Sequence, residues 1–442
     1  MNRLAWYVDE EACRDRPSGD RAVLLLGGYQ GFANFGDVLQ LKGVVRWHRR
    51  VSGLEPIVVL STTSIADRGF HDRLRSWLGV RQLVYWSERP LDVQAVGLTE
   101  LRHAPAIGHL HVFGGECLAS RWLGVFLTLI ESTHARFGVG HYVLSGQQAD
   151  LTAVPRLREH FNRHPPIVAG GRDPESADHI AAAGAPAAYS FDDALEPLDQ
   201  LVAEATRHQD LEPRRADALI HLNTSYYTAA DGDRNGQPAT SLVGDLRALA
   251  RAVARSDVEP AEVVVLQAFD DRRVDEISDS LGTIVELEDG FPFPAYRVVD
   301  LARLALELAR RPVAATLPSS ARLAYTCSYH VTLLCTVLGI PCFLRAENSF
   351  YRQKRALLGL SAGTLTQFLR CPEAPTLERQ RCAREDWLNR LEAAYGGARA
   401  VAGRPARGTP PDGAAAPLEP KPGIAALRSS LRRGVTSDQR TR

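Results

Sequence analysis

Short apolar runs that end in glycine and lead into a helical pattern recur along this 442-residue chain. The first run is Val23–Leu26, which stops at Gly27-Gly28, and apolar residues recur with helical spacing from Asp37 onwards. Because strands that alternate with helices pair in parallel, this recurrence predicts a doubly wound α/β sheet. Glycines let a backbone approach a ligand closely, and free N–H groups at the start of a helix attract anions. The first unit is therefore either a phosphate-handling turn or an ordinary tight turn at the head of a sheet.

A second series of the same units follows a charged, weakly periodic stretch, and this predicts two domains with the active site in the cleft between them. One large sheet is the alternative. The end of the chain is rich in Gly, Ala, Pro and Arg, a composition that cannot bury enough apolar surface to order itself. We expect a loosely attached leader at 1–20, an N-terminal Rossmann-like domain at 21–196, a crossing at 197–217, a C-terminal Rossmann-like domain at 218–395 and a disordered tail at 396–442.

Charge and cysteine content exclude several classes of function. The 52 basic and 52 acidic residues cancel, so a nucleic-acid partner is not expected. Seven cysteines without metal-ligand spacing predict reduced thiols and no metal site. The first residues lack the pattern of a signal peptide, and no apolar run has the length of a membrane span. We therefore expect a cytoplasmic protein, and the arginines of the tail leave open a weak peripheral contact with the inner membrane face.

Four glycine-bearing blocks follow one another along the chain. They are Gly27–Gly43, His111–Ala119, Gly170–Leu195 and Thr326–Leu360. In order and spacing they resemble the polysaccharide pyruvyl transferase family. That family shows a G-Y-x-G-x-x-N-x-G-D start, a glycine cluster, an R-D-x-x-S segment and a late His before G-x-P and a Lys. The resemblance covers roughly Val23 to Leu360.

The resemblance implies a GT-B-like fold of two facing Rossmann-like domains and a transferase activity. Pyruvate would pass from phosphoenolpyruvate to a sugar of a glycan or glycan precursor, lipid-linked acceptors included, and form a ketal. No cofactor is implied besides phosphoenolpyruvate as the donor substrate. This donor carries a phosphate and a carboxylate, so its site needs several positive or N–H donors. An acid must protonate its vinyl carbon, and a base must take the proton of the attacking hydroxyl.

His330 is the best single candidate for this chemistry. Ser328 is a plausible N-cap, which places His330 in the first turn of a helix, where an anion is favoured. A histidine there could donate to a leaving phosphate or move a proton near neutral pH. Its position alone favours a capping or supporting role for His330, whereas the family pattern favours a catalytic role.

Arg172 and Asp173 follow a predicted strand and two glycines, so both should face the cleft. Arg172 suits bidentate binding of a carboxylate or phosphate, and Asp173 could orient it or accept a proton. An ordinary Arg–Asp pair on a loop is the alternative. Lys354, with Asn348 and Tyr351, matches the family's late segment, and Lys354 would be a point charge for phosphate.

Carboxylates at other strand and helix ends leave two readings open. Asp37 and Asn34 lie at the start of the first helix, where they would stabilise the helix or act on the substrate. Asp192 ends a predicted strand and would either position the acceptor or serve as a hinge or cap.

Two positions depart from the family pattern. Ser328 stands where many members carry an arginine, and Glu116 stands where a third glycine is common. Glu116 would repel an anionic donor but could hold a sugar hydroxyl. The missing charge could come from another late arginine, of which the candidates are Arg322, Arg345, Arg352 and Arg355. The departures keep open a GT-B-type glycosyltransferase that uses a nucleotide sugar, and a catalytically silent glycan-binding relative.

The expected catalytic residues are His330, Asp173 and Asp37; the expected substrate-binding residues are Arg172, Lys354, Asn34, Ser328, Asn348, Tyr351, Glu116 and Asp192.

Overall fold

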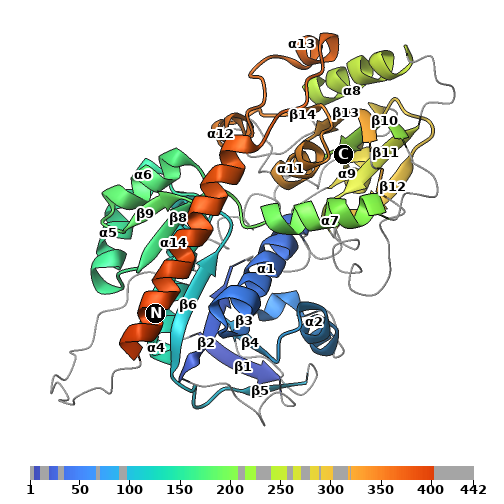
Figure 1. The fold of residues 1–442 in the computed structure, drawn as a ribbon. Helices are drawn as coiled ribbons and strands as arrows, with labels where there is room; N and C mark the ends of the chain where they lie inside the picture. The colour runs from blue at the N-terminus through green and yellow to red at the C-terminus, as the bar shows by residue number, and fades with distance from the viewer. Residues whose placement is uncertain are drawn as a thin grey trace, which may run out of the picture.

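The protein folds into two α/β lobes, each built on its own sheet (Figure 1). The computed structural model describes residues 4–9, 19–27, 34–65, 70–88, 97–207, 215–224, 240–255, 262–269, 279–287, 290–301, 317–318 and 320–402. The glycine-rich segment 28–33 and the predicted tail beyond residue 402 lie outside these residues. The expected α/β class with two Rossmann-like domains, the GT-B-like arrangement, is confirmed.

The sheet of the first lobe runs in the order β5-β1-β4-β3-β2-β6-β7-β8-β9 among the described strands. Its strands are β1 Ala5–Asp9, β2 Gly19–Leu26, β3 Glu55–Ser61, β4 Gln82–Ser87, β5 Leu98–Glu100, β6 Ile107–Phe113, β7 His141–Gln147, β8 Val168–Gly171 and β9 Ala187–Tyr189. Neighbours from β4 to β9 are parallel, whereas β1 pairs antiparallel with β4 and β5. The order reverses between β2 and β6, which is where ligands bind in doubly wound sheets.

The sheet of the second lobe is parallel throughout its described strands, in the order β12-β11-β10-β13-β14. Its strands are β10 Arg215–His221, β11 Val263–Gln267, β12 Arg297–Asp300, β13 Ser320–Thr326 and β14 Cys342–Leu344. The described α-helices of both lobes are α1 Phe35–Trp47, α2 Phe70–Leu78, α4 Ser120–Phe137, α5 Val154–Arg163, α6 Pro174–Ala182, α7 Leu195–Arg207, α8 Thr240–Val253, α9 Ser280–Leu287, α11 Tyr329–Val337, α12 Ser349–Leu357, α13 Leu365–Arg370 and α14 Glu378–Ala402. None of these helices has the length and apolar character needed to cross a membrane.

Strand β2 shows why the apolar runs of this chain are continuous rather than alternating. Val23 and Leu25 belong to one buried cluster with apolar residues of α1, and Leu24 and Leu26 belong to another with residues of α4. A parallel strand covered by helices on both faces buries every side chain. The cluster on the α1 side continues through α7 and α11 into the second lobe, so the two lobes share a core.

Three expected boundaries differ from the observed ones. Residues 1–20 are not a loose leader, because they contain β1, where Trp6 and Val8 are buried. The expected crossing at 197–217 is largely helix, since α7 spans Leu195–Arg207.

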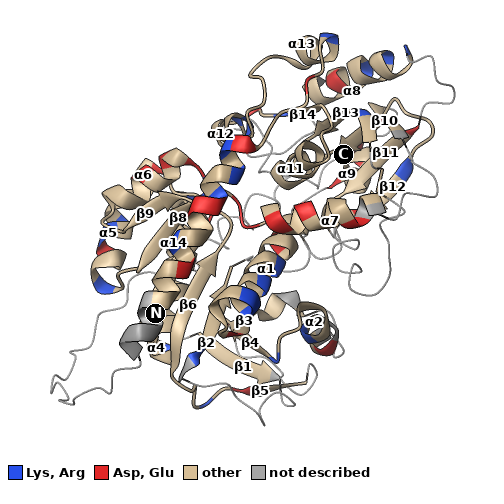
Figure 2. Ribbon diagram, viewed as in Figure 1, with Lys and Arg blue, Asp and Glu red and all other residues tan. Residues whose placement is uncertain are grey.

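The end of the expected second domain in fact belongs to the first lobe. Helix α14 runs back along β8 and β9, as Figure 1 shows, and carries both basic and acidic residues (Figure 2). Trp387 is fully buried there, and a Cβ added at Gly170 of β8 would lie 2.9 Å from its ring. The helix continues past the expected start of the tail at residue 396 to Ala402.

Candidate functional site

A pocket lies between the lobes, at the carboxyl ends of strands from both sheets. On the first lobe it is lined by residues that follow β6 and β8 and by the start of α1; on the second, by residues that follow β10, β11 and β13 and by α12. The lining residues are Asn34, Asp37, Gly114, Gly115, Glu116, Cys117, Trp122, Phe126, Arg172, Asn223, Phe269, Ser328, Tyr329, His330, Phe350, Tyr351 and Lys354. Parallel α/β sheets place their ligands at this edge.

His330 lies in the first turn of α11, as predicted. Ser328 is the N-cap by backbone geometry, but its side chain makes no capping hydrogen bond. His330 Nε2 is 3.5 Å from Asp192 Oδ2 and 3.4 Å from Gln40 Nε2. Burial lowers the pKa of His330 and outweighs the opposing effect of Asp192. The neutral imidazole is therefore favoured, and a neutral imidazole can accept a proton.

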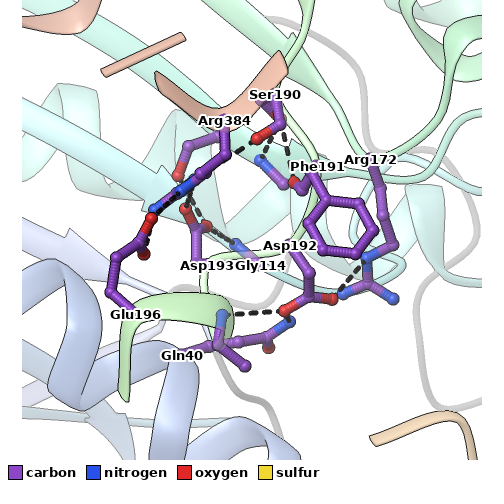
Figure 3. Close-up of polar contacts among 12 residues, drawn as sticks. Gln40, Gly114, Arg172, Ser190, Phe191, Asp192, Asp193, Glu196 and Arg384 are labelled. Carbon is purple, nitrogen blue, oxygen red and sulfur yellow. Dashed lines mark hydrogen bonds and ion pairs between the residues drawn. The ribbon is translucent and has the colours of Figure 1, made fainter. Parts of the chain in front are cut away.

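Arg172 and His330 meet on the same carboxylate, that of Asp192. Arg172 Nε is 3.1 Å from Asp192 Oδ2, and both side chains are almost fully buried. Gln40 donates to Asp192 Oδ1 at 2.9 Å, and Figure 3 shows the Gln40 amide and the Arg172 guanidinium on either side of this carboxylate. Burial alone would raise the pKa of Asp192, but the charge of Arg172, helped by the contacts with His330 and Gln40, holds it well below its usual range. Asp192 therefore stays ionised and fixes two pocket side chains.

The Arg172 guanidinium has N–H donors that make no hydrogen bond to the described residues. Its contact with Asp192 is an ion pair without hydrogen-bond alignment, and buried Nε and Nη2 have no hydrogen-bond partner among the described residues. Burial by itself would lower the pKa of Arg172, but Asp192 and other nearby groups raise it, so the charge is permanent. A buried donor without a partner costs free energy of about 1–3 kcal/mol. A planar oxyanion in the pocket would give Nη2 a hydrogen-bond acceptor.

Lys354 supplies the second cation, enclosed by rings. Its Nζ lies 3.7 Å from the ring centre of Phe350, and 5.4 and 5.3 Å from those of Tyr329 and Tyr351. It donates to Glu116 Oε1 at 3.1 Å. Burial lowers the pKa of Lys354 to about 8, although Glu116 opposes the shift. The ammonium is thus charged at neutral pH, but only by a small margin.

Asn34 and Asp37 lie where the lobes touch. Asn34 forms a bridge with Phe269 of the second lobe, and its side chain caps α1 by accepting from Gly36 N at 2.9 Å. The side chain of Asn34 therefore acts as a helix cap, which was the alternative reading of this residue. Asp37, in the first turn of α1, lines the pocket.

Three predicted site residues do not reach the ligand space. Asp173 is the N-cap of α6, where its carboxylate accepts from Ser176 N at 2.7 Å and from Ser176 Oγ at 2.9 Å, and it faces a separate hollow. Its predicted catalytic role is therefore corrected to a helix cap. Asn348 is the N-cap of α12 and accepts from Tyr351 N at 2.8 Å. Asp192 has no exposed surface and positions other residues instead of holding the acceptor.

The charge lost at Ser328 is not replaced by another late arginine. None of the four candidates lines the described pocket; these are Arg322, Arg345, Arg352 and Arg355. Arg345, for example, pairs with Glu347 at 2.7 Å. Among the described residues, the cations that line the pocket are Arg172 and Lys354.

Sequence reasoning missed several residues of this site. Gln40 gave no signal because a single glutamine in a helix pattern is unremarkable in sequence. Tyr329 stands next to His330, and its buried hydroxyl has no hydrogen-bond partner among the described residues. Its ring lies 5.4 Å from Arg172 Cζ. The position of Tyr329 in the first turn of α11 was the one available signal.

Asp193 is not among the residues that line the pocket, but it holds the glycine loop that does. Its carboxylate accepts from Ser145 Oγ at 2.7 Å, and from Gly114 N at 3.0 Å and Arg384 Nη1 at 2.7 Å, the two contacts that can be followed in Figure 3. Gly114 and Gly115 have φ values of 52° and 84°, which favour glycine. The glycine loop that lines the pocket is thus tied through Asp193 to α14.

Gly36 is expected to be intolerant of alanine because His330 packs against it. A Cβ at Gly36 would lie 1.9 Å from His330 Nδ1, so Gly36→Ala must push the imidazole away. We expect a loss of about 1–3 kcal/mol in the free energy of unfolding, measured by urea denaturation. Gly244→Ala, in helix α8 with open space around it, is the matched control and should be stabilising by up to about 1 kcal/mol. Equal stability of Gly36→Ala and wild type would contradict the close packing of His330.

Comparisons with known proteins give a likeness of fold and no family. No family model and no curated protein matches the chain. Among solved structures, the chain is similar to a UDP-GlcNAc 2-epimerase from Neisseria meningitidis, with 9% identity over 86% of this chain and 98% of that chain and a TM-score of 0.39. The UDP-GlcNAc 2-epimerase of Methanocaldococcus jannaschii has 11% identity over 79% and 90%, with a TM-score of 0.35. The ADP-heptose LPS heptosyltransferase II of E. coli has 11% identity over 84% and 99%, with a TM-score of 0.29. Nothing about the chemistry of this chain follows from likenesses this distant.

Proposed function

We propose that the protein is a polysaccharide pyruvyl transferase-like enzyme that moves pyruvate from phosphoenolpyruvate to a sugar as a ketal. The observation that carries the proposal is the buried Arg172 guanidinium, whose Nη2 has no hydrogen-bond partner among the described residues, in the same pocket as His330 and Lys354. The four ordered sequence blocks that resemble this family supply these three residues.

The pocket offers two kinds of site for a donor with two anionic groups. Arg172 provides a planar fork that suits a carboxylate or a phosphate. Lys354 provides a compact charge, and the start of α11 at Ser328 provides free N–H groups and the positive end of a helix dipole. We expect the carboxylate and the phosphate of the donor to bind to Arg172, to Lys354 and to the start of α11.

The proposed reaction balances with inorganic phosphate as its second product. A proton adds to the methylene carbon of phosphoenolpyruvate, and a sugar hydroxyl attacks the resulting cation at the neighbouring carbon. The C–O bond to phosphate then breaks, with its electron pair leaving on phosphate, and a second hydroxyl closes the ketal. Of the two hydroxyl protons, one offsets the proton added to carbon and one leaves with phosphate.

His330 is the base in this scheme, because its neutral form is favoured and it is held by Asp192 and Gln40. Among the described lining residues, Asp37, Glu116 and Lys354 are further groups that can pass a proton to the methylene carbon. Asp192 is a positioning residue.

A glycosyltransferase that uses a nucleotide sugar is the second candidate. Two observations favour it. The pocket has an aromatic lining, on which a nucleobase could stack, made by Trp122, Phe126, Phe269 and Phe350. The pairing of Lys354 with Glu116 also leaves less positive charge for a small anion.

Turnover and donor binding together test the proposal. Purified protein is incubated with phosphoenolpyruvate and a panel of galactoside and mannosaminyl acceptors, and phosphate release and a pyruvyl mass gain are followed. In parallel, thermal shifts are measured with phosphoenolpyruvate and with nucleotide sugars, since a specific ligand raises stability. We expect stabilisation by phosphoenolpyruvate. Stabilisation by nucleotide sugars alone would favour the second candidate, and glycan binding without either donor would indicate a catalytically silent protein.

The charge of Lys354 is expected to set the alkaline limit of activity. Because its pKa is about 8, the ammonium is lost as the pH rises through 8, and kcat/KM for the donor should fall tenfold per pH unit above it. Lys354→Arg keeps its charge at all these pH values and should remove this limb from the profile while lowering activity at pH 7. Lys42→Arg is the control, because the Lys42 ammonium lies over Trp77 at 5.6 Å and does not line the pocket. A wild-type profile that stays flat to pH 9.5 would contradict a need for this charge.

A further inference from the structure

The ion pair between Glu116 and Lys354 joins the two lobes across the pocket. Glu116 follows β6 of the first lobe, and Lys354 lies on α12 of the second lobe. Their side chains approach to 3.1 Å and are 18% and 8% exposed. Both line the pocket. Lys354 therefore already has a counter-ion when no ligand is bound.

The two cations of the pocket differ in how their counter-ions are held. Asp192, the partner of Arg172, is fully buried and is also held by Gln40 and by Ala194 N. Glu116 has no such support: among the described residues, Lys354 is the hydrogen-bond partner of its side chain. The Asp192 carboxylate is thus fixed, whereas Glu116 can leave.

The rings around Lys354 hold the ammonium in place without the help of Glu116. Phe350 lies under Nζ at 3.7 Å, and Tyr329 and Tyr351 lie on α11 and α12. Cation–π contacts of this kind fix a cation but do not neutralise it. If an incoming anion took the place of Glu116, it would supply the counter-ion that keeps Lys354 charged, and the ammonium would stay at the same place and face the pocket.

We propose that Glu116 is an exchangeable counter-ion, which a tetrahedral dianion such as a phosphate group replaces on Lys354. The exchange selects for charge, because a monoanion only substitutes for one carboxylate, whereas a dianion gains an additional attraction. Glu116 is then a specificity-determining residue that keeps monoanionic metabolites from occupying the Lys354 site. The identity of the donor rests on the proposed function; the exchange itself needs only a dianion.

The exchange is tested first in the wild-type full-length chain, by labelling carboxylates. A water-soluble carbodiimide and an amine nucleophile modify accessible carboxylates, and peptide mass spectrometry gives the extent at Glu116 with and without saturating sulfate. Sulfate is a tetrahedral dianion that does not consume the reagent. We expect labelling of Glu116 to rise at least threefold with sulfate, because the carboxylate is released. Glu347, which pairs with Arg345 outside the pocket, should be unchanged.

The second test compares anion affinity between variants by calorimetry with inorganic phosphate and with acetate. In Glu116→Gln the phosphate no longer has to displace a carboxylate, so phosphate should bind at least tenfold more tightly, and acetate should gain measurable binding. Glu347→Gln is the matched control and should behave as wild type. A purely structural pair predicts the opposite pattern, with lower thermal stability in Glu116→Gln and unchanged phosphate affinity.

Three results would overturn the proposal: no binding of sulfate or phosphate to the wild type, unchanged or reduced labelling of Glu116 when sulfate is bound, or equal phosphate affinity of wild type and Glu116→Gln. If Glu116→Gln does not fold, the labelling of the wild type decides. None of these readouts requires turnover. Failure of pyruvyl transfer with a positive labelling result would therefore reject the proposed function and leave the exchange in place.

Discussion

Replacing Arg172 by lysine is expected to lower kcat/KM for the donor by about 10²- to 10⁴-fold in a protein that still folds. The planar fork is lost, and with it two charge-assisted hydrogen bonds of about 1.5–3 kcal/mol each. A factor of ten in rate corresponds to about 1.36 kcal/mol, which gives the expected range. The measurement is phosphate release at subsaturating phosphoenolpyruvate.

Lysine is the informative substitution because it keeps a positive charge beside Asp192. Arg172→Met would leave that carboxylate buried without its cation, which costs about 3–5 kcal/mol of stability and would confuse a binding defect with unfolding. Arg163→Lys is the control for the same chemical change, since Arg163 is half exposed and pairs with Glu131 away from the pocket. Wild-type kcat/KM in Arg172→Lys would show that the guanidinium does not hold the donor.

Replacing Arg384 by methionine is expected to destabilise the protein by about 3–5 kcal/mol. Its guanidinium pairs with Asp193 at 2.7 Å and with Glu196 at 2.8 Å, and the Asp193 side chain is 2% exposed. Removing the cation leaves a buried carboxylate uncompensated, which is more costly than the net value of the pair. Because Asp193 also accepts from Gly114 N, the glycine loop of the pocket should loosen together with α14.

A neighbour on the same helix provides the matched control. Arg381 pairs with Asp199, but these side chains are 45% and 36% exposed, so Arg381→Met should cost no more than about 1 kcal/mol. Urea denaturation of both variants gives the comparison. Similar losses in the two variants would contradict the importance of burial, and a small loss in Arg384→Met would show that α14 does not depend on this contact.

Much of the fold and part of the site could be predicted from the sequence because their signals are local. Strand β2 and helix α1 were readable from Val23–Leu26 and from the apolar spacing after Asp37. The position of His330 in the first turn of α11 followed from Ser328 as N-cap, and Arg172 followed from its place directly after β8. In each case a few neighbouring residues determine the backbone, and a parallel sheet brings strand ends to one edge.

The errors concern one local helix cap and two elements whose packing partners lie far away in the chain. Asp173 has the sequence context of a cleft residue, but its side chain caps α6. The first twenty residues looked unattached because a single edge strand such as β1 shows its role only when β4 and β5 are beside it. Helix α14 looked like the end of the second domain, but it lies on the first lobe.

Local patterns in the chain are enough to predict the α/β class, the order of its units and the residues that can carry charge to a strand end. Tertiary structure alone decided which charges meet: Arg172 and His330 on Asp192, Glu116 with Lys354 across 238 positions, and Arg384 with Asp193 across 191. The physical reason is that periodicity and capping act over a few residues of the chain. An ion pair depends instead on distance in space and on burial, which only the packed lobes define.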